Sequence, residues 1–264
     1  MIGFNALGQL GRFGNQMFQF SALKGIAINR GYQFCFPPSQ NKDEYKDHQL
    51  LVPFKMENTS QLNVQYIDSD RPTVPESGFA FDENLFNDCP DWVSIRGYFQ
   101  TEKYFKHIRD ELLQDFAFKD EIKEPCDEMM DTFDKPPLSL HIRRTDYIAN
   151  PNHTTLDISY YEEALEQFDD DREVIVFSDD PEWCHNEPTF DSDRFLIAEG
   201  NSQYIDMCLM AMCNGHITAN SSFSWWGAWL SNSEKVIAPS GWFKGSNNEH
   251  LDTKNIVPEE WEII

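Results

Sequence analysis

Four short apolar segments alternate with amphipathic segments in the second half of this 264-residue chain. The apolar segments cover residues 138–142, 174–177, 216–219 and 236–239, and the amphipathic segments include residues 159–168 and 202–212. The first kind is typical of buried strands and the second of helices. Strands that alternate with helices form parallel sheets joined by right-handed crossovers, so the pattern predicts an α/β fold.

The start of the chain shows the same order of strand, loop and helix. An apolar run at residues 2–7 precedes a loop with three glycines, and apolar positions then recur at helical spacing from Met17 to Ala27. Gly31 is placed to end that helix. Between residues 33 and 90, Pro, Asn and Asp interrupt the apolar runs, which predicts loops and short strands.

The middle of the chain suggests where one domain ends and the next begins. Residues 93–99 alternate like a strand, residues 102–117 carry a helical pattern, and residues 119–136 form an acidic helix that leads into a linker. Because roughly 130 residues is a common domain size, we predict an N-terminal domain at residues 1–136 and a C-terminal domain at residues 137–264.

The composition limits the partners of the chain. Its 21 Lys and Arg against 45 Asp and Glu give a net charge of -24, which argues against a nucleic-acid partner. No apolar run approaches the ~18 residues of a membrane span, and no signal-peptide pattern is visible. We therefore expect a cytoplasmic protein whose six cysteines, none in a Cys-x-x-Cys pair, stay reduced.

Polar residues follow the first three apolar segments of the second half. They are Arg143 and Arg144, then Asp179 and Asp180, then Asn220, Ser221 and Ser222. The carboxyl ends of parallel strands form the ligand-binding edge of such a sheet. Arginine binds phosphate with two parallel hydrogen bonds, and a helix that begins with serines offers further donors to an anion. The sequence therefore predicts a pyrophosphate site, with a carboxylate of Asp179 or Asp180 near a ribose or a purine.

Other readings of these residues remain open at this point. Arg143 could pair with Asp146 or Asp179 in a structural ion network, and three tryptophans at positions 225, 226 and 229 are expected to fill the core. Two Asp-x-Asp strings, at 68–70 and 191–193, follow no apolar strand and are expected to be exposed loop acids. Since no His and Cys cluster has metal-ligand spacing, we expect no metal and no cofactor.

Several motifs resemble those of the α1,2-fucosyltransferase family. Residues 141–147 are similar to its His-x-Arg-Arg-x-Asp motif, residues 218–228 to its C-terminal motif, and residues 14–19 to its N-terminal one. Between them, the segments Gly97-Tyr98-Phe99-Gln100, Glu102-Lys103-Tyr104-Phe105, Tyr160-Tyr161, Phe177-Ser178-Asp179-Asp180 and Val236-Ile237-Ala238-Pro239 fall in the family's order. The run Gly11-Arg12-Phe13-Gly14 differs from the family's usual opening and is similar to that of the protein O-fucosyltransferases.

The resemblance implies a fold and an activity. The fold would be GT-B-like, with two Rossmann-like parallel-sheet halves that face a cleft. The first domain would bind the acceptor and the second GDP-fucose. The activity would be metal-independent transfer of fucose, with inversion, from GDP-fucose to the 2-hydroxyl of a galactose-containing glycan. The chain would be a bacterial or viral soluble member that acts in the cytoplasm.

The resemblance also implies roles for single residues. Arg143 would bind the β-phosphate with help from Arg144, and His141 would lie near the nucleoside. Asp179 or Asp180 would lie near guanine or ribose, and Asn15 near the transferred sugar. The remaining donor-binding residues would be Asn220, Ser221 and Ser222, with the two serines on phosphate.

The general base and the reaction class each keep alternatives. Asp146 is the first candidate for the base, or else it orients an arginine, and His153 and Asp157 follow it as candidates. The chain could also be a protein O-fucosyltransferase-like enzyme, or a non-catalytic module that binds a glycan or a nucleotide. The intact Arg143 favours an enzyme.

Overall fold

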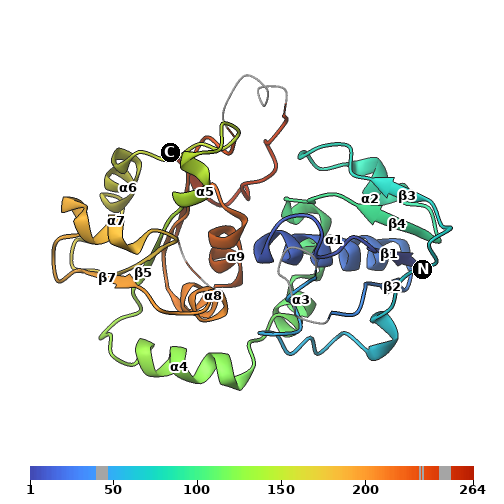
Figure 1. Ribbon diagram of the computed structural model, residues 1–264, viewed down its shortest axis with the longest axis horizontal. Helices are drawn as coiled ribbons and strands as arrows, with labels where there is room; N and C mark the ends of the chain where they lie inside the picture. Colours follow the sequence, from blue (N-terminus) through green and yellow to red (C-terminus); the bar gives the residue numbers. More distant parts are fainter. Residues whose placement is uncertain (40–46, 232, 234, 244–250) are drawn as a thin grey trace. The chain divides into compact units, whose positions relative to one another are not determined.

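The chain folds into two compact units in the computed structural model, which describes residues 1–39, 47–231, 233, 235–243 and 251–264 (Figure 1). The first unit comprises Met1–Lys119 and Leu251–Pro258. The second comprises Asp120–His250 and Glu259–Ile264. Each unit is built on its own sheet, and every strand pair in both sheets is parallel in the described chain.

The first unit holds a sheet of strand order β2-β1-β4-β3. Its elements are β1 (Ile2–Gly3), α1 (Phe13–Arg30), β2 (Phe34–Cys35), η1 (Gln61–Asn63), β3 (Thr73–Pro75), α2 (Glu83–Asp88), β4 (Val93–Arg96), η2 (Glu102–Tyr104), η3 (Lys106–Ile108) and α3 (Arg109–Asp115). Gly31 ends α1 in the left-handed conformation with φ 68°, and the Tyr32 amide donates to the Ala27 carbonyl at 2.8 Å. The predicted role of Gly31 is therefore confirmed.

The helix predicted at residues 102–117 is only partly right. The segment forms two short 3-10 turns, η2 and η3, before α3 begins. Phe105, between those turns, has φ -142° and ψ 0°, which breaks the helical path. Gly25 of α1 packs against the Tyr104 carbonyl so closely that a Cβ there would collide with it. The interruption of the predicted helix thus coincides with a tertiary contact to α1, which the spacing of apolar residues in this segment does not indicate.

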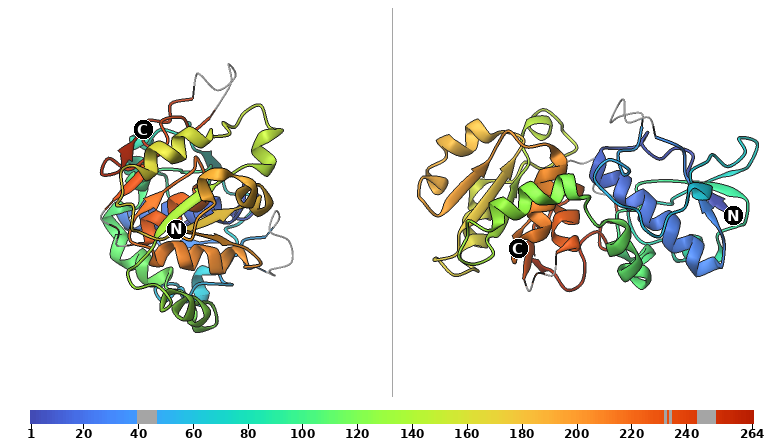
Figure 2. Two further views of the ribbon diagram at one scale, coloured as in Figure 1. Left: turned by 90° about the vertical axis from the view of Figure 1, so that its left-hand side faces the viewer. Right: turned by 90° about the horizontal axis from the view of Figure 1, so that it is seen from below.

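The second unit holds a six-stranded sheet of order β10-β9-β8-β5-β6-β7. Its elements are α4 (Asp120–Met130), β5 (Leu138–Ile142), α5 (Thr145–Ile148), α6 (Ile158–Leu165), β6 (Val174–Ser178), α7 (Pro181–Asn186), η4 (Pro188–Phe190), β7 (Phe195–Ala198), α8 (Gln203–Met212), β8 (His216–Ile217), α9 (Ser222–Leu230), β9 (Val236–Ala238) and β10 (Glu262–Ile263). Helices lie on both sides of this sheet (Figures 1 and 2). The four predicted strands are present, whereas β7 and β10 were not predicted.

The strand order of this second sheet indicates at which edge a ligand would bind. The chain starts at β5 in the middle, adds β6 and β7 on one side, and then returns to add β8, β9 and β10 on the other. This is the Rossmann order, in which the crevice for a ligand opens where the direction of winding reverses. Here the reversal lies between β5 and β8.

The boundary between the units lies earlier than the predicted division at residues 136 and 137. Helix α4 belongs to the second unit. Its Cys126 is fully buried, and the Cys126 Sγ contacts the Ile205 carbonyl of α8 at 3.7 Å. Residues 251–258 also return to the first unit, where the Asn255 side chain accepts a hydrogen bond from the Phe81 amide at 3.1 Å. Because the chain returns to the first unit at residues 251–258, a single domain boundary in the sequence cannot describe the two units.

The tryptophan-rich helix α9 is part of the core of the second unit. Trp225 and Trp226 are fully buried and Trp229 nearly so, which confirms their predicted role as core residues. The rings of Trp225 and Trp226 meet edge to face with centroids 5.0 Å apart. Within the described ranges, no helix is long and apolar enough to cross a membrane.

Candidate functional site

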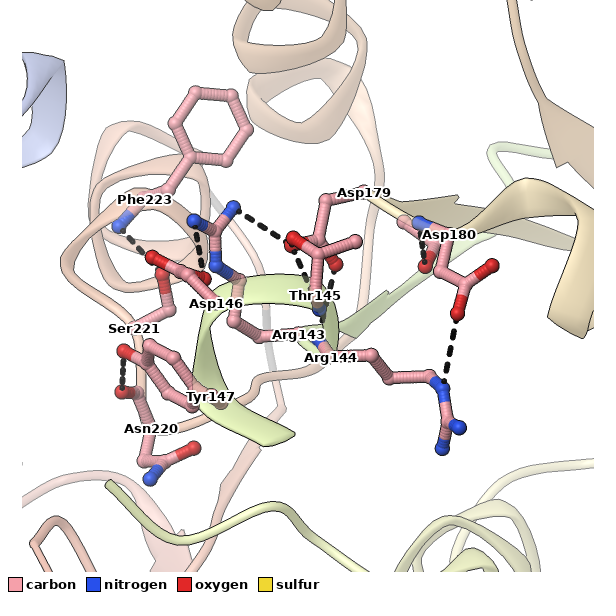
Figure 3. Close-up of polar contacts among 11 residues, drawn as sticks. Arg143, Arg144, Thr145, Asp146, Tyr147, Asp179, Asp180, Asn220, Ser221 and Phe223 are labelled. Carbon is pink, nitrogen blue, oxygen red and sulfur yellow. Dashed lines mark hydrogen bonds and ion pairs between the residues drawn. The ribbon is translucent and has the colours of Figure 1, made fainter. Parts of the chain in front are cut away.

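The predicted site residues of the second unit gather at the carboxyl ends of β5, β6 and β8 (Figure 3). Strand β5 pairs with both β6 and β8, so residues that follow the three strands meet at one edge of the sheet. Arg143 and Arg144 follow β5, Asp179 and Asp180 follow β6, and residues 218–221 lead from β8 into α9. The sequence prediction that these three groups share one edge is supported by this geometry.

Arg143 lies between two carboxylates. Its Nη2 is 2.7 Å from Asp146 Oδ1, and its Nη1 is 3.2 Å from Asp179 Oδ2. The Arg143 side chain is 17 % exposed, whereas that of Asp146 is 44 % exposed. Burial alone would lower the pKa of Arg143, but the two carboxylates outweigh burial and raise that pKa. The ion network of Arg143 with Asp146 and Asp179, one of the alternatives from the sequence, is therefore present, and its Asp146 carboxylate is exposed to water.

Asp179 holds the turn between β5 and α5. Its Oδ1 accepts from the Arg144 amide at 2.9 Å, and its Oδ2 accepts from the Thr145 amide at 3.2 Å and from the Thr145 hydroxyl. Together with the contact to Arg143, these bonds use both carboxylate oxygens within the protein. Asp179 therefore fixes the position of Arg143. Thr145 also belongs to the site, although the sequence analysis gave this motif residue no role.

Arg144 has a separate set of partners and points away from Arg143 (Figure 3). Its Nε is 3.3 Å from Asp180 Oδ2, and its guanidinium lies 4.0 Å from the centre of the Trp183 ring. Asp180 also caps α7, since its Oδ1 accepts from the Trp183 amide at 3.3 Å. The structure thus holds the two guanidinium groups in different surroundings. Trp183 was not predicted, because a stacking partner five residues beyond β6 leaves no pattern.

His141 is a neutral, buried side chain at the end of β5. It is 4 % exposed, and within the described chain its Nδ1 has no hydrogen-bond partner. Burial, with the nearby charge of Arg143, lowers the pKa of His141 to about 3, and Asp179 opposes this shift. Its ring lies 5.8 Å from that of Phe223 on α9. A neutral imidazole at this edge can donate or accept one hydrogen bond without adding charge.

Asn220 connects three segments around the site. It is 2 % exposed, and its Nδ2 donates to the Thr154 and Trp242 carbonyl oxygens, both at 3.0 Å. Its own carbonyl accepts from the Tyr147 hydroxyl at 3.0 Å. The amide nitrogen of the Asn220 side chain is therefore used inside the protein, and its Oδ1 is buried without a hydrogen-bond partner among the described residues.

Ser221 and Ser222 stand at the start of α9. The Ser221 hydroxyl accepts from the Phe223 amide at 3.3 Å and so caps the helix, and Ser222 is the first helical residue. The nine residues of α9 direct the positive end of the helix dipole toward the β5 and β8 strand ends. This helix start supplies the electrostatic environment that the sequence predicts for an anion.

The alternative bases differ in their positions. The His153 ring stacks on the Tyr147 ring with centroids 4.2 Å apart and an angle of 10°, which places it beside the Asp146 helix. Burial lowers the pKa of His153. Asp157 is exposed at the N-cap position of α6 and makes no capping hydrogen bond. Tyr147, which sequence reasoning did not single out, joins Arg143, Asn220 and His153.

Asn15 belongs to the first unit. It lies in the first turn of α1, and its Oδ1 accepts a hydrogen bond from Gln100 Nε2 at 2.5 Å. Its predicted place beside the transferred sugar stays a prediction, as do the ligand contacts of the other site residues. The two Asp-x-Asp strings are exposed. Among the described residues, no group of three or more His, Cys, Asp or Glu side chains is arranged to hold a metal ion.

Comparison with known proteins relates this geometry to a family. Residues 2–264 match the model of the family described as glycosyl transferase family 11. The chain is 35 % identical over 198 residues to the O-antigen biosynthesis glycosyltransferase WbnK of Escherichia coli, a match that covers 67 % of this chain and 65 % of that protein. It is 38 % identical over 188 residues to an Escherichia coli alpha-1,2-colitosyltransferase, which covers 65 % and 62 %. These matches span slightly less than two thirds of the relatives' own lengths.

The chain is also similar to an animal enzyme in sequence and to solved structures in fold. The chain is 26 % identical over 246 residues to human galactoside alpha-(1,2)-fucosyltransferase 1, with 86 % of this chain and 65 % of that protein covered. Solved structures of POFUT1 with GDP and of NodZ alpha-1,6-fucosyltransferase with GDP both match at a TM-score of 0.56 and 14 % identity. The POFUT1 match covers 90 % of this chain and 97 % of that one, and the NodZ match covers 95 % and 96 %. They confirm the predicted α/β fold class of GT-B type.

Proposed function

Because the chain belongs to glycosyl transferase family 11, and is therefore a glycosyltransferase, we propose that it transfers fucose from GDP-fucose to the 2-hydroxyl of a galactoside. The observation that carries the proposal is the position of Arg143, at the point where the winding of a Rossmann-ordered sheet reverses. A guanidinium there, beside the start of α9, suits a diphosphate that must accept negative charge as it leaves.

The proposed reaction proceeds with inversion in one displacement. The acceptor oxygen forms a bond to C1 of fucose while the bond from C1 to the β-phosphate oxygen breaks, and GDP leaves with the electron pair. Arg143 and the amides at the start of α9 stabilise the charge that develops on that oxygen. Since these groups supply positive charge, we propose that no divalent ion is required.

Asp146 is the proposed general base. In the structure its carboxylate pairs with Arg143 Nη2 at 2.7 Å, while Asp179 holds the other arm of the fork and the adjoining turn. A phosphate that binds Nη2 takes the place of the exposed Asp146 carboxylate rather than that of Asp179. The released carboxylate then accepts the proton of the acceptor hydroxyl. Binding of the donor thus prepares the base.

Transfer of colitose is a second candidate activity. It is favoured by the 38 % identity to an alpha-1,2-colitosyltransferase. Colitose is fucose that lacks the 3-hydroxyl, so both donors present the same diphosphate to Arg143. A site that hydrogen-bonds the 3-hydroxyl would reject colitose strongly, whereas an apolar contact there would reject fucose only weakly.

The decisive experiment presents the purified chain with GDP-fucose and GDP-colitose, several β-galactosides and a folded peptide acceptor. Fucose on the 2-hydroxyl of a galactoside, identified by NMR of the product, is the expected result. Faster transfer of colitose than of fucose would identify GDP-colitose as the donor. Fucose on Ser or Thr of the peptide would identify a protein as the acceptor. Binding of GDP or glycan without any transfer would overturn the proposal and indicate a non-catalytic module. Arg143→Ala serves as the inactive control.

A further inference from the structure

In the first unit, β3 and β4 also end side by side, so the residues that follow them lie at one edge of the sheet. Glu76 directly follows β3, and Gly97, Tyr98, Phe99 and Gln100 follow β4. Strands β3 and β4 are parallel and adjacent, so these residues meet at one edge of the sheet. The segment 97–100 is one of the sequence motifs, and the reaction described above gives it no task.

Glu76 is bound tightly to the chain after β4. Its Oε2 accepts from the Tyr98 amide at 2.8 Å and from the Phe99 amide at 2.9 Å. Its Oε1 is buried and has no hydrogen-bond partner among the described residues. Gly97 allows this approach, since a Cβ there would lie 2.5 Å from Glu76 Cβ. One carboxylate therefore determines the path of the backbone from residue 97 to 99.

The backbone at Phe99 is strained, and the consecutive side chains of Tyr98 and Phe99 have different surroundings: the Phe99 ring is buried and the Tyr98 ring is exposed. Phe99 has φ 54°, a conformation that few residues other than glycine adopt. Its ring is fully buried, 5.8 Å from Phe4 and 5.2 Å from Tyr104. Tyr98 is 36 % exposed, and its ring stacks on that of Phe79 at 5.9 Å and 19°. Strain of this kind is found mainly where a structure holds a ligand site in shape.

Gln100 brings a further polar group to the same strand end. It is 6 % exposed, and its Nε2 donates to Asn15 Oδ1 at 2.5 Å. Its Oε1 is buried without a hydrogen-bond partner in the described chain. An aromatic pair with one exposed ring, Tyr98, and one half-buried ring, Phe79, beside buried and fixed polar groups is the composition of a small-molecule site.

We propose that the Phe79–Tyr98 ring pair is the stacking surface for a sugar of the acceptor glycan, and that Glu76 is the positioning residue that fixes this surface. The inference rests on the proposed function, which requires an acceptor site. The apolar C–H face of galactose matches a stacked ring pair, and its hydroxyls match carboxylate and amide groups. A phosphate fits less well, because burial raises the pKa of Glu76 and the charged neighbour that raises it further is the Asp82 carboxylate, which would repel an anion.

The test compares Tyr98→Ala with the matched control Tyr98→Phe, which keeps the ring. Tyr98→Ala is expected to raise the KM for a β-galactoside by about tenfold or more, the scale of losing one aromatic contact. The KM for GDP-fucose should stay unchanged, and Tyr98→Phe should remain within about twofold of the wild type. An unchanged galactoside KM in Tyr98→Ala, or an equal rise in both KM values, would overturn the proposal.

A binding measurement separates this proposal from the proposed function. Saturation-transfer NMR with methyl β-galactoside and no donor should give a signal with the wild type and lose it with Tyr98→Ala. A signal that persists in the variant, or none with the wild type, overturns the stacking surface even if transfer occurs. Loss of the signal in Tyr98→Ala supports the surface even if the wild type transfers no fucose, in which case the proposed function alone fails.

Two variants of Glu76 test its positioning role. Glu76→Gln keeps an oxygen for the Tyr98 and Phe99 amides, whereas Glu76→Ala leaves both amides without that acceptor. Glu76→Ala should raise the galactoside KM as Tyr98→Ala does with kcat little changed, and Glu76→Gln should restore it to within about threefold. Equal galactoside KM values for the two variants would remove the positioning role.

Discussion

Replacing Asp146 by Asn removes the carboxylate that lies 2.7 Å from Arg143 Nη2. A donor phosphate that binds Arg143 has to displace this carboxylate. Because Asp146 is 44 % exposed, the ion pair is screened by water and contributes about 0.2–1 kcal/mol. Its loss should therefore tighten GDP binding by at most about fivefold.

The effect of Asp146→Asn on the rate should be much larger and of opposite sign. An amide cannot accept the proton of the acceptor hydroxyl, so kcat should fall by about 10²–10⁴. Calorimetry with GDP and initial-rate measurements at saturating GDP-fucose give the two numbers. Asp193→Asn is the matched control, since Asp193 is exposed just before the amino end of β7, and it should leave both unchanged.

Two outcomes would refute this reasoning about Asp146. If Asp146→Asn weakens GDP binding together with the rate, Asp146 orients Arg143 and does not compete with the donor. The search for the base would then turn to His153, which stacks on Tyr147 beside Asp146. If the Asn variant keeps both the rate and the affinity, Asp146 has neither role.

Three other predictions concern the metal, the core and the pH. Excess EDTA should leave the turnover rate within about twofold of the rate without EDTA. A loss of more than about 90 % of activity that Mg²⁺ or Mn²⁺ restores would contradict this prediction and would indicate that a metal ion stabilises the leaving group. Lys24→Met should lower the unfolding free energy in urea by ~3–5 kcal/mol, because it leaves the fully buried Asp115 carboxylate without its cation; a loss below ~1 kcal/mol would contradict the pair's importance. Burial raises the pKa of Glu76 from 4.5 to about 7, with Asp82 adding to the shift, so folding favours its protonated form. The stability that this protonated form contributes is present below about pH 4.5 and is lost as the pH rises to about 7. The unfolding free energy of the wild type should therefore fall by ~3 kcal/mol relative to that of Glu76→Gln over this range. Parallel curves of unfolding free energy against pH for the two proteins would contradict this prediction.

Burial accounts for part of what the sequence predicts about the strands of the second sheet. All five residues of β5 and the first four of β6 are buried. These four residues of β6 form a continuous apolar run, whereas in β5 the buried Ser139 and His141 alternate with apolar residues. Strand β7 lies at the edge of the sheet, and its Leu196 is 41 % exposed. Its four residues, Phe195–Ala198, are nevertheless all apolar, so the prediction overlooked a short apolar run that pairs with β6.

The residues of the site were predictable where side chains pair with side chains. Asp146 and Asp179 were both named as partners of Arg143, because one is three residues away and the other follows the neighbouring strand. Glu76 could not be found in this way. Its partners are the backbone amides of Tyr98 and Phe99, and every residue except proline carries such an amide. The contact also joins segments 22 residues apart, in a region without clear periodicity.

The measurement that tests the central claim most directly compares Arg143→Lys and Arg143→Ala with the wild type in GDP binding and kcat. If Arg143 binds the leaving diphosphate with its fork, Arg143→Ala should lower kcat by at least ~100-fold. Arg143→Lys should fail as well, because a point charge cannot hold the Asp179 carboxylate on one arm and a phosphate on the other, as the planar fork does. Circular dichroism should show that both variants keep the fold. A lysine variant with near-normal kcat and GDP affinity would contradict the account.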